Sequence, residues 1–194
     1  MSWSKCVYLY HKERQGKFLG DSQEAKLIMD YKGRPLSINY YLSEGRYGMS
    51  RIQACVSVET EKAFQLSISP KKKSGGLFAL LEEGFFDHEL GRRINTNDEE
   101  RARMVISDPE LRAALLACPD KNIEVNPGPE GTHMLRVYVL NPEGLRSTWP
   151  MCAVDNDYEP EIKNADEIRQ MFFPPFERLL KVTYAACAAV ERVN

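Results

Sequence analysis

The sequence predicts an α+β fold, in which a mainly antiparallel sheet of about six to eight strands is combined with two short central helices and a C-terminal helix packed on one face. Two observations predict it. Apolar and polar residues alternate with a period of two through much of the first half, whereas segments 97–118 and 164–193 place apolar residues at helical spacing. We expect a single domain over residues 1–194, with residues 1–24 as a candidate peripheral segment.

Strict alternation predicts three strands in the first half. Each has its apolar residues on one face and mostly polar residues between them, which is typical of an antiparallel sheet with one solvated side. These strands are Leu36 to Leu42, Ile52 to Val58 and Phe64 to Ile68. A fourth strand, Lys26 to Tyr31, is expected to meet the Leu36 strand in a hairpin, because Gly33 between them accepts a positive φ. A second hairpin turn is expected at Thr60 to Ala63.

Two consecutive helices are predicted after a strand at Phe85 to Asn95. A capping box that begins at Asn97 predicts the start of a helix over Asp98 to Ile106. Ser107 to Pro109 predicts the start of the next helix, which ends before Pro119.

The chain is expected to return to strands and then to end in helices. The strands are expected at Ile123 to Val125, His133 to Leu140 and Trp149 to Val154. A short helix that begins near residue 164 should end before Pro174, and Pro175 can occupy the first turn of a final helix that runs to about Val193. Leu179 lies on the apolar face of that final helix.

Composition excludes some classes of function. The 26 basic and 28 acidic residues are mixed along the chain and give a net charge of −2, which argues against a nucleic-acid partner. No run of residues is long and apolar enough for a membrane span or a signal peptide. The five cysteines form no CxxC pair, so we expect reduced thiols, no bound zinc and a cytoplasmic location. No cofactor is predicted.

Two histidines and one arginine are the candidate site residues. Alternation along the Phe85 to Asn95 strand places Phe86, His88 and Arg92 on its apolar face, and His133 lies on the apolar face of a later strand. If those strands were neighbours, His88, Arg92 and His133 could form a binding site. The alternative is that each histidine satisfies local hydrogen bonds in the core or at a strand end. No catalytic residue and no metal ligand is predicted.

Two polar loops have the residue types of an ion or phosphate site without the full pattern. Asp155 to Glu161 places carboxylates at every second position but lacks the glycine and the terminal glutamate of a calcium loop. Pro70 to Gly76 contains lysine and glycine but not in the order of a phosphate-binding loop. Both segments are therefore interpreted as solvated loops.

The order of several short motifs resembles that of a known family. GlyArg at 33–34, GlyPhePheAsp at 84–87 and ProGluLeuArgAlaAlaLeuLeu at 109–116 together resemble an uncharacterised bacterial domain with an FDxxF strand followed by an LRxxLL helix and a terminal helix. The resemblance covers about residues 25–194, with Leu90 where that pattern has an aromatic residue. It implies the same α+β fold and leaves the function open, since the family has no established activity, and Phe86 and Asp87 match the most recognisable pair of the pattern.

Three functional hypotheses follow from these observations. The first is a non-catalytic binding or scaffolding domain with an unknown protein partner or with self-association. The second is a small hydrolase or metal-assisted enzyme that uses His88 and His133. The third is an apolar-ligand carrier, in which the sheet curves around the terminal helix.

Overall fold

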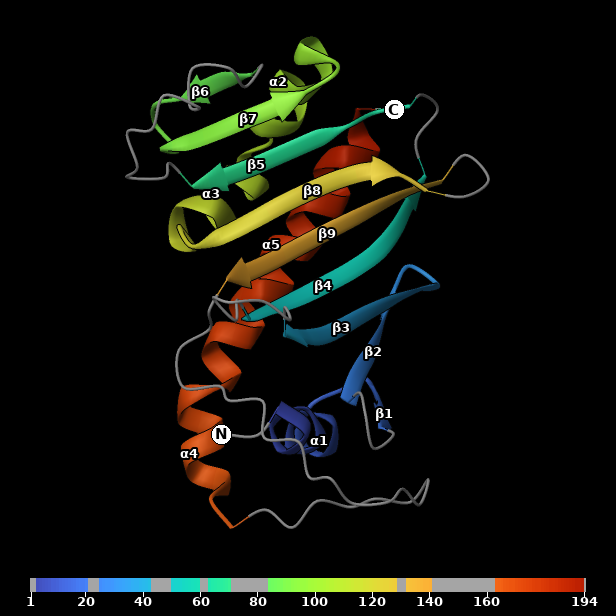
Figure 1. The fold of residues 1–194 in the computed structure, drawn as a ribbon, viewed down its shortest axis with the longest axis vertical. Coiled ribbons are helices and arrows are strands. Elements are labelled where there is room, and N and C mark those ends of the chain that lie inside the picture. Colours follow the sequence, from blue (N-terminus) through green and yellow to red (C-terminus); the bar gives the residue numbers. More distant parts are fainter. Residues whose placement is uncertain are drawn as a thin grey trace. The chain divides into compact units, whose positions relative to one another are not determined.

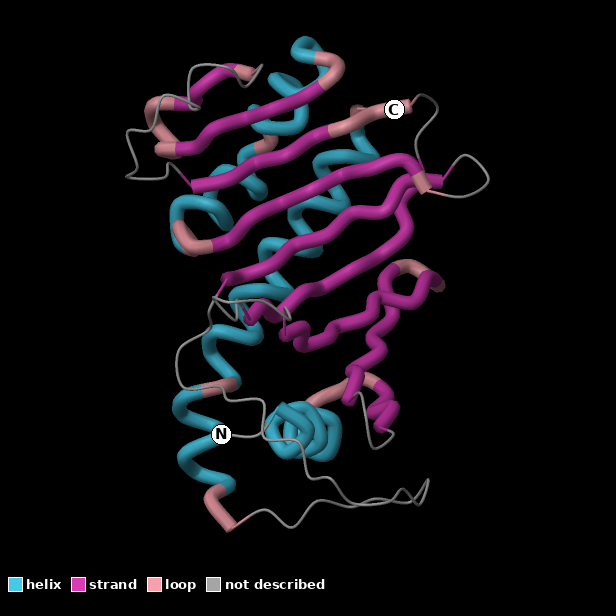
Figure 2. The backbone as a smooth tube through the Cα atoms, viewed as in Figure 1, coloured by secondary structure: helices cyan, strands magenta, loops and turns pink. Residues whose placement is uncertain are grey.

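The computed structural model describes residues 3–20, 25–42, 50–59, 63–70, 84–128, 132–140 and 163–193. Within these residues the chain has an α+β fold with five helices and an antiparallel sheet of nine strands, more strands than the sequence predicts (Figures 1 and 2). The chain divides into two compact units, residues 1–56 with 139–178 and residues 57–138 with 179–194.

The first unit is built on strands that pair in the order β1-β2-β3-β4, with each neighbour antiparallel. Its elements are α1 (Trp3–Glu13), β1 (Lys17–Gly20), β2 (Ala25–Tyr31), β3 (Arg34–Leu42), the first part of β4 (Ser50–Glu59), α4 (Ala165–Met171) and the first turns of α5 (Phe173–Arg192). The predicted hairpin between β2 and β3 is present. Lys32 and Gly33 form its turn with φ values of 52° and 80°, as a two-residue turn with two positive φ angles requires.

Helix α1 was not predicted, although its sequence has helical spacing. Trp3, Cys6, Val7 and Tyr10 follow the i, i+3, i+4, i+7 pattern, and all four are buried. The indole N–H of Trp3 donates to the Ala25 carbonyl at 2.7 Å. Aromatic rings from α1, from residue 172 and from the start of α5 then pack together, and each ring contacts at least two of the others: Trp3, Tyr10, Phe172, Phe173 and Phe176. This aromatic cluster forms much of the core of the first unit.

The second unit has strands in the order β9-β8-β5-β7-β6. Its elements are β5 (Leu66–Pro70), β6 (Phe85–Asp87), β7 (Arg92–Thr96), α2 (Glu99–Ser107), α3 (Pro109–Ala117), β8 (Lys121–Pro127), most of β9 (Thr132–Leu140) and the later part of α5. Helices α2, α3 and this part of α5 lie on one face of these strands (Figure 1). Their inward residues, among them Val105, Leu111, Leu115, Leu179 and Val190, are each at most 1% exposed.

Two predictions about strand connections are wrong. The Phe85 to Asn95 segment is a hairpin, not one strand, because β6 and β7 are antiparallel neighbours on either side of a turn at residues 88–91. Gly91 supplies the positive φ of 63° that this turn needs. Strand β5 pairs with β7 and β8, so no hairpin joins it to β4 at Thr60 to Ala63. Alternation identifies the face of a strand but not its partner.

Within the described ranges, no helix is long and apolar enough to cross a membrane. Four cysteines in this part of the chain are free thiols, and burial raises the pKa of the Cys6 thiol to about 12. Cys152, the acidic segment Asp155 to Glu161, the strand expected at Trp149 to Val154 and most of Pro70 to Gly76 lie outside the described residues.

Leu179 and Phe86 should respond differently to truncation. Leu179 is 1% exposed, so Leu179→Ala should cost about 2 to 5 kcal/mol of unfolding free energy. Phe86 is only half-buried, because it lies in a three-residue strand at the sheet edge, so Phe86→Ala should cost less. Urea denaturation monitored by circular dichroism measures both. Equal losses at the two positions would contradict the burial assigned to Phe86.

Candidate functional site

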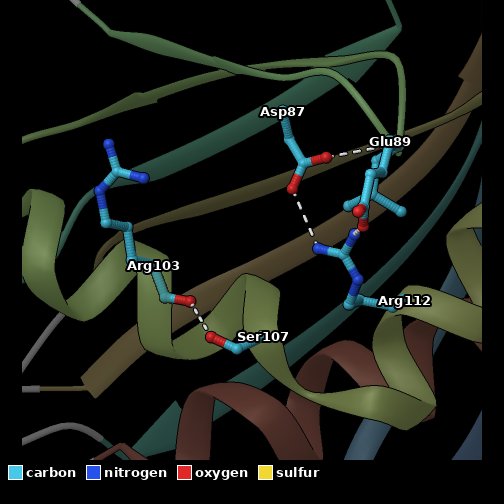
Figure 3. Close-up of polar contacts among 6 residues, drawn as sticks. Asp87, Glu89, Arg103, Ser107 and Arg112 are labelled. Carbon is cyan, nitrogen blue, oxygen red and sulfur yellow. Dashed lines mark hydrogen bonds and ion pairs between the residues drawn. The ribbon is translucent and has the colours of Figure 1, made fainter.

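The β6–β7 hairpin is fixed to α3 by a carboxylate and an arginine. The Asp87 carboxylate accepts from the Leu90 main-chain N–H at 2.8 Å and pairs with the Arg112 guanidinium at 3.0 Å (Figure 3). Burial opposes ionisation of Asp87, but the hydrogen bond from Leu90 and the charge of Arg112 outweigh it and hold the pKa of Asp87 below its ordinary value. Arg112 also pairs with Glu89 at 2.5 Å. Asp87 therefore fixes a turn and docks a helix.

The structure also explains why a glycine stands at position 84, at the start of the GlyPhePheAsp motif. Gly84 has a φ of 151°, and a Cβ at this position would lie 2.2 Å from the Ile94 carbonyl oxygen. No side chain fits there without displacement of the neighbouring β7 backbone. The GlyPhePheAsp motif is thus explained by a close strand approach at one end and a turn at the other.

Arg92 is buried as predicted, at 1% exposure. It lies on β7 of the β6–β7 hairpin, and its hydrogen bonds go to main-chain carbonyls. Its guanidinium donates to the carbonyls of Lys121 at 2.5 Å, Cys118 at 3.0 Å and Leu115 at 3.4 Å. These carbonyls belong to the last turn of α3 and to the chain that leaves it, where Leu115 O also accepts from the Cys118 N–H and Cys118 O from the Lys121 N–H, both at 3.3 Å. Arg92 is accordingly a cap for the end of α3.

His133 is buried, at 3% exposure, and its ring accepts a hydrogen bond. The Phe64 main-chain N–H donates to His133 Nε2 at 3.0 Å, so the neutral ring has its proton on Nδ1. Burial and the nearby Arg101 charge lower the pKa of His133. Arg101 itself lies over the Phe64 ring, 5.2 Å from its centroid. This places Phe64, Arg101 and His133 in one contact group, and Arg101 was not among the predicted site residues.

His88 lies elsewhere, and the prediction that it occupies an apolar face is wrong. It follows β6 in an exposed turn, with its ring 4.9 Å from the Phe86 ring. The reason is the turn at residues 88–91, which ends the alternation that was extended through Phe86 to Ile94.

The three candidate residues do not come together. Strands β7, β5 and β8 lie between β6, which His88 follows, and β9, on which His133 lies. Arg92 on β7 is three strand spacings from β9, or about 14 Å in a sheet with neighbours about 4.8 Å apart. Within the described part of the chain, no group of three or more His, Cys, Asp or Glu side chains is placed to hold a metal ion. The arrangement of these three residues can fix the fold but brings no reacting groups within reach of one another.

Comparisons with known proteins add no constraint. No family model matches the sequence, and neither curated proteins nor solved structures give a match. The resemblance to an uncharacterised bacterial domain stays a prediction.

Replacement of Arg92 should show its capping role. Arg92→Met keeps much of the side-chain volume but leaves the carbonyls of α3 and of Lys121 without this donor, so the unfolding free energy should fall by about 2 to 4 kcal/mol. Arg92→Lys should recover only part of the loss, because an ammonium group cannot reproduce the planar fork. Urea denaturation measures both, with Arg93→Met as the control. An unchanged unfolding free energy in Arg92→Met would contradict the capping role of Arg92.

Protonation of His133 should destabilise the protein. Because the pKa of His133 is lowered in the folded state, the unfolded chain binds the proton first. The contribution of neutral His133 is therefore fully present above its unfolded pKa of about 6.5 and is lost as pH falls below it, by at most about 1.4 kcal/mol per pH unit. His133→Gln should flatten this dependence between pH 7.5 and 5. Unfolding free energies with the same pH slope in the wild type and in His133→Gln would contradict the assignment.

Proposed function

We propose that the chain is a non-catalytic binding domain that recognises a protein partner through the outer face of α3. The observation that carries the proposal is the exposure of Leu116, which is 59% exposed on a helix whose opposite face is buried in the core. Ala113, three residues before Leu116, and Ala117, next to it, are also exposed, so the C-terminal half of the outer face of α3 carries an apolar stripe, while Glu110 in the first turn is exposed and charged. An exposed apolar patch on a helix is typical of a protein-binding surface.

The stripe lies on a helix that is held in place at several points. Asp108 caps the start of α3 through hydrogen bonds from the N–H groups of Glu110 and Leu111, both at 3.0 Å. Arg112 anchors the helix to the β6–β7 hairpin, and Arg92 caps its end. Because the helix is already ordered, binding of a partner costs little conformational entropy on this side of the interface. The fixed position of α3 therefore supports a role in binding a protein. The separation of His88 and His133 by several strands also favours a binding domain over the hydrolase hypothesis.

The test is partner capture with a matched pair of variants. Leu116→Gln and Met171→Gln each remove one apolar side chain of similar exposure, 59% and 53%, but Met171 lies on α4 in the first unit. Both variants should keep the unfolding free energy within about 0.5 kcal/mol of the wild type. Quantitative affinity purification from the native cell should then show at least a tenfold loss of a specific partner with Leu116→Gln alone. The same result for both variants, or capture of no specific partner, would overturn the proposal.

A further inference from the structure

Three ion pairs border the outer face of α3, one near its start, one beside its middle and one just past its end. The pairs are Glu110 with Arg192 at 3.1 Å, Glu89 with Arg112 at 2.5 Å and Asp120 with Lys121 at 2.6 Å. Figure 3 shows the middle pair, in which Arg112 of α3 reaches Glu89 in the β6–β7 turn. Glu110 and Arg112 are about 200° apart around the helix axis, so their pairs flank the apolar stripe of Ala113, Leu116 and Ala117 from opposite sides.

In each pair the carboxylate is more exposed than the cation. The exposed fractions of the side chains are 84% and 25% for Glu89 and Arg112, 56% and 3% for Asp120 and Lys121, and 70% and 52% for Glu110 and Arg192. Each arginine also pairs with a more buried carboxylate, Arg112 with Asp87 and Arg192 with Asp108. These contacts among the described residues join five carboxylates to three cations, a net charge of −2. The border of the stripe is therefore acidic.

The sign of this border selects the chemistry of a partner. Charges at the rim of an interface attract a partner of opposite sign and repel one of the same sign. An acidic rim disfavours a nucleic acid or an anionic lipid surface, because both present phosphate groups. It favours a segment that combines apolar side chains with lysine or arginine.

The main chain of α3 restricts the conformation of that segment. The N–H groups of Glu110 and Leu111 donate to the Asp108 carboxylate, and the carbonyls of Leu115 and Cys118 accept from Arg92. A strand binds by pairing with free main-chain groups, which this surface does not offer. A helix satisfies its own main chain and packs its side chains between those of a second helix. The nine residues of α3 extend about 13 Å, which matches two to three turns of a partner helix.

We propose that the partner segment is a basic amphipathic helix. Its apolar face packs on Ala113, Leu116 and Ala117, and lysine or arginine side chains beside that face pair with Glu89, Glu110 and Asp120. The inference rests on the protein-binding role proposed for α3 and adds the chemistry of the partner. The apolar contact supplies most of the affinity, and the acidic border selects a basic helix over a neutral or acidic one.

The probe is a synthetic amphipathic peptide of leucine and lysine, with leucines at i, i+3, i+4 and i+7, and the control peptide has glutamate in place of every lysine. Fluorescence anisotropy of the labelled peptides is measured on titration with the full chain. The lysine peptide should bind in a saturable way, and the glutamate peptide about tenfold more weakly or not at all. Binding of the lysine peptide should also weaken from about 0.01 M to about 0.1 M salt, as the Debye length falls from about 30 Å to about 10 Å. Equal binding of the two peptides, or no saturable binding of the lysine peptide, would overturn the inference.

Variants of the chain locate the binding surface. Leu116→Gln should weaken binding of the lysine peptide about tenfold. Glu89→Gln and Glu110→Gln should each weaken it about threefold, and both together about tenfold. These two variants should fold, because Arg112 keeps Asp87 and Arg192 keeps Asp108. The controls are Glu177→Gln and Met171→Gln, which change exposed residues of the first unit and should bind as the wild type does. Equal losses in the controls would place the peptide elsewhere and would also overturn the inference.

Two further outcomes separate this inference from the role proposed for α3. If a partner captured through Leu116 is retained equally by the Glu89→Gln, Glu110→Gln double variant, the protein-binding role stands and the basic helix is wrong. Vesicles of phosphatidylserine and phosphatidylcholine should not sediment the full chain. Sedimentation that is lost in Leu116→Gln would identify the outer face of α3 as a membrane surface, and both proposals would then fail.

Discussion

The Arg92 guanidinium is the contact on which the arrangement of the second unit depends. It joins β7 to the end of α3 and to the start of β8, because one planar group with five donors reaches carbonyls from all of these segments. Once the end of α3 is fixed, its middle can pair with Asp87 through Arg112, and its start can be capped by Asp108. A buried arginine that serves main-chain carbonyls thus replaces the contacts that an isolated helix end would make with water.

Much of the fold can be predicted from the sequence, since the periodicity of apolar residues reports the buried face of each element. The β2–β3 hairpin and the terminal helix follow from it, and Leu179 lies in the core as its spacing indicates. Pairing between strands that no hairpin joins could not be predicted, because partners such as β5 and β8 are far apart in sequence and alternate in the same way. Helix α1 was missed although its spacing was visible, because its apolar run from Cys6 to Tyr10 is short and is flanked by polar and charged residues.

The candidate site was less predictable than the fold. Arg92 and His133 are buried, but their roles depend on main-chain groups of other segments, and Phe64 is 69 residues from His133. His88 was misplaced because the alternation was extended across a turn that Gly91 could have indicated. The sheet face that carries the polar residues was expected to be solvated, but Asn39 on β3 and Gln53 on β4 are buried on it, at 9% and 4% exposure. Residue type and period predict which residues share a face, but whether that face is covered depends on the tertiary structure.

The junction between α2 and α3 restricts how this chain can vary in length. Helix α2 ends at Ser107 and α3 begins at Pro109, so Asp108 alone separates them and acts as the C-cap of one and the N-cap of the other. The same carboxylate also binds Arg192 near the end of α5. An inserted residue would rotate α3 about its axis relative to α2 and take the carboxylate away from one of its partners. Homologous chains should therefore keep a single-residue spacing here and accommodate insertions in other connections.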